Sequence, residues 1–173
     1  MNVKYFKYAM QELREQYLNV ELDTILHPSP KVTKKATIEL RIALDKIGQI
    51  DQIGLAAQKW AEEGYAYHTS ENYNEAIRCY TEAIHLKPDF AEAYFYRGFI
   101  NGIQNNNLDD EIADYTEAIR IKPDYEEAYC SRAAARGDKG DYLGLIEDCN
   151  EALRLKPNDA QAYNNRGNGK HNT

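Results

Sequence analysis

Apolar residues recur at steps of three and four along most of the chain, which is the period of amphipathic helices and not of strands. The pattern therefore predicts an all-α fold. In the first 50 residues it forms two stripes, separated by the sequence "HPSP" at 27–30. The first stripe consists of Val3, Phe6, Met10, Leu13, Tyr17 and Val20, and the second of Ala36, Leu40, Ala43, Ile47 and Ile50.

The two stripes predict an N-terminal helical hairpin or cap over residues 1–56. Ser29 suits the cap of its second helix and Pro30 the first helical position, where a missing N–H costs nothing, while Gly48 could loosen the end of this helix. Two packings remain open. The hairpin could cover the rest of the chain, which we favour, or its seam at 3–20 could pair with a second copy in a homodimer.

The remainder of the chain repeats one pattern of two helices and a turn. The strings "HLKPDFAEAY", "RIKPDYEEAY" and "RLKPNDAQAY" begin at residues 85, 120 and 154, which are 35 and 34 residues apart. They define units at 57–90, 91–125 and 126–159, followed at 160–173 by a partial fourth unit or a capping helix and tail. Second helices are expected to begin after Asn72, Asn107 and Asp141, and to end before Pro88, Pro123 and Pro157.

The spacing within these units resembles the tetratricopeptide repeat over residues 57–169. That family implies a right-handed superhelix with a concave groove, lined by the first helix of each unit. The matching residues are Trp60, Gly64, Tyr67, Ala76, Tyr80 and Pro88 in the first unit, Tyr94, Gly98, Tyr115, Ala118 and Pro123 in the second, and Tyr129, Ala133, Tyr142, Ala152 and Pro157 in the third.

The family's leucine position before the glycine holds a charged residue in every unit. Arg97 and Arg132 occupy it in units two and three, and Asp114 and Asp148 stand at equivalent places on the second helices. This correlation predicts an Arg–Asp pair between the two helices of a unit, with a structural role. The alternative is that the four residues are separate surface charges.

Mapping the resemblance onto the first helices predicts a partner-binding groove. Phe95 and Phe99 lie one turn apart and are not motif residues, so we expect them to be exposed anchors for a peptide, unless the hairpin or a second copy covers them. Cys130 is expected at the inner surface, whereas Cys149 fills an aromatic core position. The predicted groove residues are Tyr65, His68, Glu92, Phe95, Phe99, Ile103, Glu127, Cys130, Asp138, Asn164 and Asn168.

Repeats of this family that hold the carboxylate of chaperone tails use a clamp of basic residues and asparagine on the same helix face. In units one to three, the corresponding places carry no Lys or Arg, so a ligand with apolar side chains and some positive charge is expected instead. These places hold Ala61, Tyr65, Phe95, Phe99, Cys130 and Ala134.

Charge and cysteine content restrict the classes of partner and the cellular compartment that we expect. The formal net charge is −7; residues 1–56 hold 8 Lys/Arg and 7 Asp/Glu, and residues 57–173 hold 13 and 21. Such an acidic body disfavours nucleic acid. Three cysteines without a short-spaced pair, and no export signal or membrane-length apolar run, lead us to expect a cytoplasmic protein without disulfides.

No catalytic motif, metal-ligand spacing or cofactor-binding sequence stands out, so we expect no enzyme activity, no metal and no cofactor. The predicted function is a non-enzymatic protein–protein interaction scaffold that binds a peptide or protein segment in the groove. Alternatives are a self-assembling homodimeric component and, less favoured because of the acidic charge, an RNA-binding helical repeat.

Overall fold

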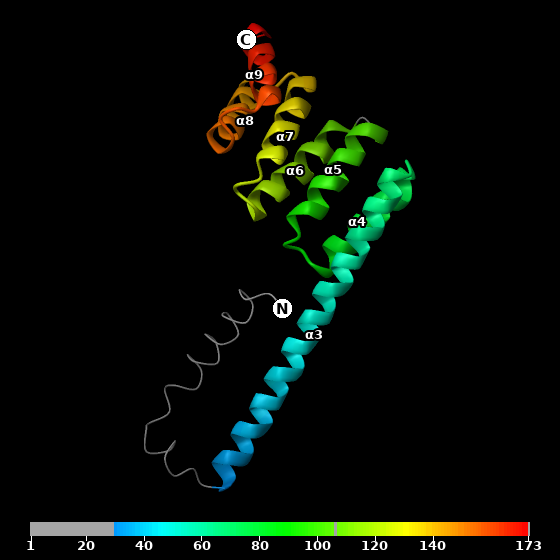
Figure 1. Ribbon diagram of the computed structural model, residues 1–173, viewed down its shortest axis with the longest axis vertical. Helices are drawn as coiled ribbons and strands as arrows, with labels where there is room; N and C mark the ends of the chain where they lie inside the picture. Colours follow the sequence, from blue (N-terminus) through cyan, green and yellow to red (C-terminus); the bar gives the residue numbers. More distant parts are fainter. Residues whose placement is uncertain (1–29, 106, 173) are drawn as a thin grey trace. The chain divides into compact units, whose positions relative to one another are not determined.

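The structure is a computed structural model of the 173-residue chain, and it describes residues 30–105 and 107–172. Within these ranges every regular element is an α-helix and no strand occurs, which confirms the all-α prediction. Figure 1 shows the helices in chain order. They are α3 (Pro30–Thr69), α4 (Tyr73–Leu86), α5 (Ala91–Asn105), α6 (Leu108–Ile121), α7 (Glu126–Asp138), α8 (Tyr142–Leu155) and α9 (Ala160–Asn172).

The chain divides into two compact units, Met1–Gln52 and Ile53–Thr173. In the first unit, the described residues form the N-terminal part of α3, where Leu40 and Ile50 of the predicted stripe are exposed. The other stripe, at residues 3–20, lies outside the described residues, and so does the predicted hairpin turn.

Helix α3 differs from the expected arrangement because it does not end near Gly48. It continues without a break from Pro30 to Thr69 and crosses the expected boundary at residue 56. No proline interrupts this stretch after Pro30, and a single interior glycine costs a helix only about 1 kcal/mol relative to alanine. The second hairpin helix and the first repeat helix are therefore one element.

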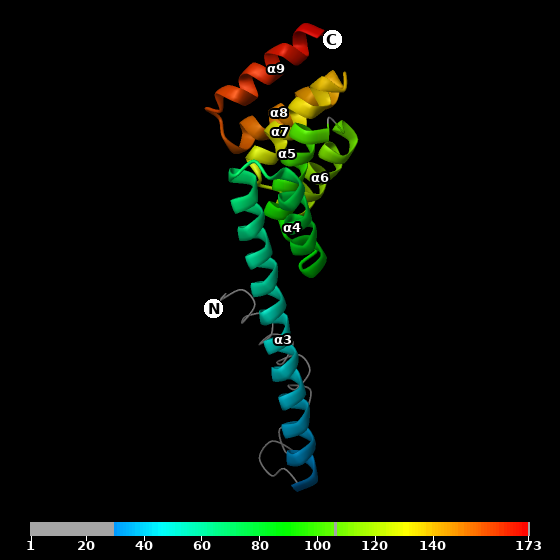
Figure 2. The same ribbon diagram turned by 90° about the vertical axis from the view of Figure 1, so that its right-hand side faces the viewer.

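The second unit is a stack of helix pairs, seen from two directions in Figures 1 and 2. The pairs are the C-terminal part of α3 with α4, α5 with α6, and α7 with α8. Contacts are most numerous within the last two pairs. Helix α9 packs mainly on α8 and less on α7, and consecutive pairs contact each other through α4 with α5 and α6 with α7. Each pair corresponds to one sequence unit.

The ends of the second helices follow the sequence signals. The Asn107 side chain accepts a hydrogen bond from the backbone N–H of Asp110, and the Asp141 side chain accepts one from Gly144. Asn72 occupies the N-cap of α4 but makes no side-chain cap bond. At the other end, the helices α4, α6 and α8 stop at a lysine that precedes each proline, as predicted.

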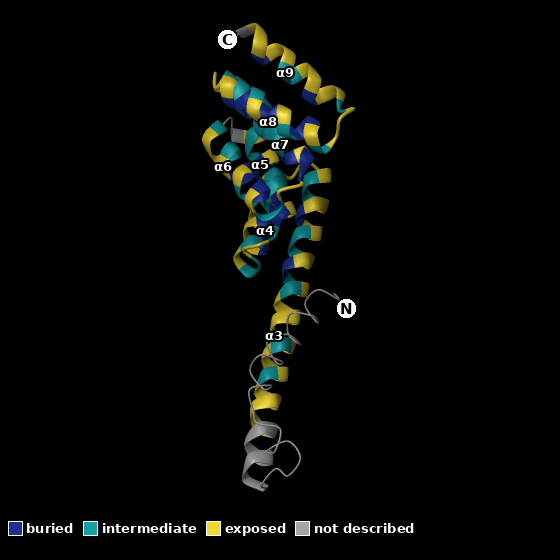
Figure 3. Ribbon diagram, turned by 90° about the vertical axis from the view of Figure 1, so that its left-hand side faces the viewer, coloured by how far each residue is buried: buried dark blue, intermediate teal, exposed yellow. Residues whose placement is uncertain are grey.

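The core consists of buried residues from both helices of each repeat, and many of them are alanines. Tyr80 and Tyr115 are each 1% exposed and Cys149 is fully buried in the same slot, which confirms its assignment to the core. Gly98 lets α5 approach α6 closely, because a Cβ there would lie 2.9 Å from the Cβ of Asp114. In Figure 3 the buried residues of the second unit face the neighbouring helices, and most outward-facing turns are exposed.

The predicted Arg–Asp pairs are confirmed, and each arginine also reaches the preceding repeat. Arg97 donates from Nε to Asp114 Oδ2 at 2.9 Å and from Nη2 to Oδ1 at 2.7 Å. Its Nη1 donates to Thr81 Oγ1 on α4 at 3.3 Å. A single side chain therefore joins three helices from two repeats.

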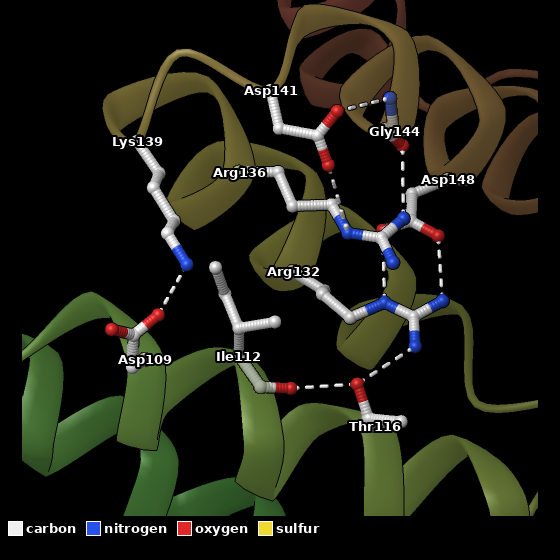
Figure 4. A network of polar contacts seen from close by, with 9 residues as sticks. All are labelled: Asp109, Ile112, Thr116, Arg132, Arg136, Lys139, Asp141, Gly144 and Asp148. Carbon is white, nitrogen blue, oxygen red and sulfur yellow. Dashed lines mark hydrogen bonds and ion pairs between the residues drawn. The ribbon is translucent and has the colours of Figure 1, made fainter.

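The same arrangement recurs one repeat later and gains a second cation (Figure 4). Arg132 makes two hydrogen bonds to Asp148, at 2.9 and 2.7 Å, and its Nη1 donates to Thr116 Oγ1 at 3.0 Å. Arg136 donates from Nη1 to Asp148 Oδ2 at 2.9 Å. The buried Asp148 carboxylate is thus held between two guanidinium groups.

Candidate functional site

A groove of about 540 Å³ opens within the second unit, between the first helices of the first two repeats. Its walls come from the C-terminal part of α3, from α4, from the turn before α5, and from α5 itself. A hollow of this size falls within the range of small-ligand and side-chain pockets. The lining residues are Gly54, Gln58, Ala61, Glu62, Tyr65, Tyr80, Lys87, Phe90, Glu92 and Tyr96.

The wall of the groove is mainly aromatic. Tyr96 stacks on Tyr80 with ring centroids 5.7 Å apart, and Tyr65 meets Tyr96 edge-on at 5.9 Å. The Tyr80 hydroxyl is buried and has no hydrogen-bond partner. Burial raises the pKa of this phenol above its ordinary value. A ligand in the groove would meet flat aromatic rings.

Charged groups at the groove are mostly acidic. Glu62 accepts a hydrogen bond from Gln58 at 3.1 Å and pairs with no cation among the described residues. Glu92 is exposed and lies 3.4 Å from the ammonium of Lys122. Lys87 is the one basic residue of the lining, and its Nζ lies 4.8 Å from the centre of the Phe90 ring.

The aromatic surface extends along the first helices beyond the groove. His68 is half-buried, with its ring centroid 6.2 Å from Tyr65 and 5.6 Å from Phe99, and its Nδ1 has no hydrogen-bond partner. Phe99 is 38% exposed, and Ile103 one turn later is also exposed. Tyr65, His68 and Phe99 therefore form one aromatic cluster, as their predicted places on the inner face require.

Phe95 lies elsewhere than expected. It is half-buried, and its ring centroid is 5.0 Å from Tyr125, 5.7 Å from Tyr115 and 5.3 Å from Tyr96. It packs against the core cluster that joins the second and third repeats. The reason is that Tyr125, in the turn before α7, brings its ring against α5. Phe95 is thus a packing residue more than an exposed anchor.

Because of this difference in burial, we expect replacement of the two phenylalanines to change stability by different amounts. Phe95→Ala should lower the free energy of unfolding by about 2–3 kcal/mol, because it empties part of a core contact. Phe99→Ala removes a more exposed ring and should change stability by less than about 1 kcal/mol. Urea unfolding followed by circular dichroism measures both. Equal losses for the two variants would contradict the distinction.

The predicted residues of the third and fourth units do not continue the groove. Cys130, expected at the inner surface, is 4% exposed, packs against Ala152 and Ala162, and donates from Sγ to Glu126 Oε1 at 3.4 Å, so its thiol is not open to a ligand. The next repeat covers it. The other predicted residues are exposed but lie outside the groove lining; they are Glu127, Asp138, Asn164 and Asn168.

Several residues that line the groove were not predicted from the sequence. Tyr96 is adjacent to Phe95, and its turn of the helix faces the preceding repeat. Phe90 and Lys87 belong to the connection between repeats, which the first-helix mapping left out. Glu62 stands next to a motif position. The shared Lys-Pro pair is the signal that could have pointed to Lys87, because it places this lysine at the same turn of every repeat.

One group of side chains has the composition of a metal site. Ligand atoms of Glu126, Cys130 and Asp159 lie within 4.8 Å of one another. The Lys156 ammonium already lies 3.0 Å from Asp159 and 3.5 Å from Glu126. A backbone hydrogen bond from Ala162, followed by the bond from Lys156, lowers the pKa of Asp159 to about 2. These contacts account for the carboxylates without an ion, and the cluster joins α7 to the turn before α9.

In the part of the chain that the structure describes, no helix is both long enough and apolar enough to cross a membrane.

Comparison with known proteins points to one family. A family model described as "TPR repeat" matches residues 64–102. No protein with a curated description matches the chain.

Several solved structures share the fold. The TPR domain of OM64 from Arabidopsis is 26% identical, with a TM-score of 0.66 over 70% of this chain and 99% of that one. The first TPR of Spaghetti (RPAP3), bound to the HSP90 peptide SRMEEVD, is 24% identical, with a TM-score of 0.65 over 68% and 93%. The TPR2B domain of yeast Sti1, in a complex with pHsp70, is 22% identical, with a TM-score of 0.63 over 69% and 99%.

Proposed function

Since the chain carries a tetratricopeptide-repeat segment, we propose that it is a non-enzymatic protein-interaction scaffold that binds a peptide or protein segment on the inner face of its repeats. The observation that carries the proposal is the groove of about 540 Å³ with its aromatic wall. Tyrosine is enriched among residues that dominate binding energy, because it offers a large rigid surface and a polar tip.

The chemistry of the groove favours one kind of ligand. Its rings accept apolar side chains, and the acidic groups Glu62 and Glu92 outnumber the basic Lys87 among the lining residues. An extended segment with apolar side chains and a nearby Lys or Arg therefore suits this surface, the cation adding an interaction with the rings.

A ligand of the opposite charge is disfavoured. The HSP90 peptide SRMEEVD bound to the first TPR of Spaghetti ends in three acidic residues and its carboxylate, with one valine among them. On this chain that tail would face the carboxylates of Glu62 and Glu92 in the groove lining, where Lys87 is the one basic residue. The nearby Lys122 is already paired with Glu92 at 3.4 Å. We expect SRMEEVD to bind the chain at least about tenfold more weakly than the Spaghetti domain in isothermal titration calorimetry. Equal affinities would contradict the proposed ligand chemistry.

The proposal is tested by selecting a ligand and then altering the groove. Peptides would be selected from a random display library on the full chain, labelled, and titrated by fluorescence anisotropy. Tyr65→Ala should weaken binding of a selected peptide by about tenfold or more, as expected for an aromatic anchor, and Phe99→Ala should weaken it less. Circular dichroism would confirm that both variants remain folded.

Leu143→Ala is the matched control, because Leu143 is 71% exposed and lies on α8, away from the groove lining. It should leave the affinity unchanged. If Leu143→Ala weakened binding as much as Tyr65→Ala, or if Tyr65→Ala had no effect on any selected peptide, the groove would not be the binding surface.

A further inference from the structure

Helix α9 carries the same residue types, at the same spacing, that α5 uses to hold its partner helix α6. Each helix has a tyrosine, an arginine three residues later, and a glycine directly after the arginine. In α5 this glycine permits close approach and this arginine binds the aspartate of α6. The residues are Tyr94, Arg97 and Gly98 in α5, and Tyr163, Arg166 and Gly167 in α9.

Arg166 is already held in the pose that Arg97 adopts. Its guanidinium lies 5.2 Å from the centre of the Tyr163 ring, and its Nη1 donates to Asn150 Oδ1 of α8 at 3.0 Å. Arg97 likewise lies 5.5 Å from the centre of the Tyr94 ring and donates to the preceding second helix. The difference is the carboxylate. Among the described residues, no Asp or Glu pairs with Arg166.

The space where a partner helix would pack is open at α9. A Cβ added at Gly98 would lie 2.9 Å from Asp114, and one added at Gly64 would lie 3.2 Å from the Tyr80 ring. At Gly167 such a Cβ would have no neighbour within 4 Å, and Tyr163 is 51% exposed. The residues that fit a second helix are present on α9, and no described helix covers them.

We propose that this face of α9, formed by Tyr163, Arg166 and Gly167, is a docking surface for an amphipathic helix of a partner protein. The partner helix would present an Asp or Glu to Arg166 and an apolar side chain over Gly167, as Asp114 and Tyr115 do in α6.

Charge supports an acidic occupant. Residues 160–173 contain Arg166 and Lys170 and no Asp or Glu, whereas the chain as a whole carries a net charge of −7. An acidic helix would therefore be attracted to this end of an otherwise acidic protein. Because the ring of Tyr163 and the amide of Asn150 already position the guanidinium, docking would order few additional side-chain rotamers. The surface is made by elements other than those that line the groove.

A peptide copied from this chain provides the probe. Residues 107–124 contain the whole of α6 with its cap, Asp114 and Tyr115. Because a short isolated helix is only marginally stable, a lactam bridge between Asp109 and a lysine introduced by Ala113→Lys, both exposed positions, would hold it helical. The fluorescein-labelled peptide would be titrated into the full chain by fluorescence anisotropy, with an Asp114→Asn peptide as its matched control.

Saturable binding is expected, and the Asp114→Asn peptide should bind about tenfold more weakly, as for loss of one charge-assisted pair. Arg166→Gln in the chain should cause a similar loss, and the two changes together should cost little more than either alone, because both remove the same contact. Gly167→Leu should abolish binding while leaving the melting temperature unchanged, since its site is open.

Two further variants distinguish this surface from the rest of the molecule. In the chain, Arg120→Gln removes an exposed arginine of α6 that pairs with Glu117 of its own helix and, among the described residues, with no other carboxylate, and it should not alter binding. Tyr65→Ala alters the groove and should also leave binding of the helical peptide unaltered, so this proposal and the groove proposal can fail independently.

Three results would overturn the inference. The first is the absence of saturable binding by the helical peptide, and the second is an equal loss from Arg120→Gln and Arg166→Gln. The third would come from light scattering of the unmodified chain: a dimer that Arg166→Gln converts to a monomer would show that a second copy, and not a partner protein, occupies the surface.

Discussion

Asp148→Ala is expected to lower the free energy of unfolding by about 3 kcal/mol, because it leaves two guanidinium groups without their shared carboxylate. Asp148 is buried and accepts hydrogen bonds from Arg132 and Arg136 at 2.7–2.9 Å. The residue also anchors the arginine that reaches Thr116 in the preceding repeat. Its loss should therefore weaken the contact between repeats as well as the third repeat itself. Urea unfolding followed by circular dichroism measures the change.

Two variants control for this result. Asp148→Asn keeps the shape of the side chain but removes its charge, and it should also destabilise the chain substantially. Glu151→Ala breaks the exposed pair between Glu151 and Arg154 on the same helix, and we expect no measurable change, because solvent screens such pairs. A negligible effect of Asp148→Ala would mean that the arginines find water or other partners at little cost.

Tyr115→Ala should be at least as damaging, with a loss of about 4 kcal/mol in the free energy of unfolding. The side chain is 1% exposed, packs between α5 and α6, and contacts Phe95 of the inner face. Its removal leaves a cavity between α5 and α6. Differential scanning calorimetry would show the loss as a lower melting temperature.

Tyr115→Phe isolates the part played by the hydroxyl, which interacts with Glu111 and Ser131, and it should cost about 1 kcal/mol or less. Tyr65→Ala is the exposed counterpart and should change the melting temperature little. If Tyr65→Ala proved as harmful as Tyr115→Ala, burial would not be the cause of the effect.

The repeat period of the sequence was sufficient to predict most of the helices and several individual contacts. Prolines and caps located the second helices, and the equivalent placement of Arg97 with Asp114 predicted a contact between helices that the structure confirms. Because these features recur in three repeats, the residue at a position in one repeat can be compared with the residues at the equivalent positions in the other two. Cys149 could be assigned to the core for the same reason, since tyrosines fill its slot in the other repeats.

The groove was harder to predict because its lining depends on contacts that differ between repeats. Phe95 occupies an inner-face position, yet Tyr125, 30 residues later, packs against it. Cys130 is covered by residues of α8 and α9, which no property of its own helix reveals. Exposure of a first-helix position is set by the size of side chains on the following repeat, and a single-unit motif contains no such information.

The buried cysteines can serve as probes of local unfolding. Cys79, Cys130 and Cys149 are free and buried, and burial raises the pKa of each thiol, to about 11 for Cys149. A protonated, covered thiol reacts with a labelling reagent only after the surrounding helices separate. The rate of thiol labelling therefore measures how often the helices of the first and third repeats separate. Comparing the labelling rates of Cys79 and Cys149 would show whether the two repeats open independently or together.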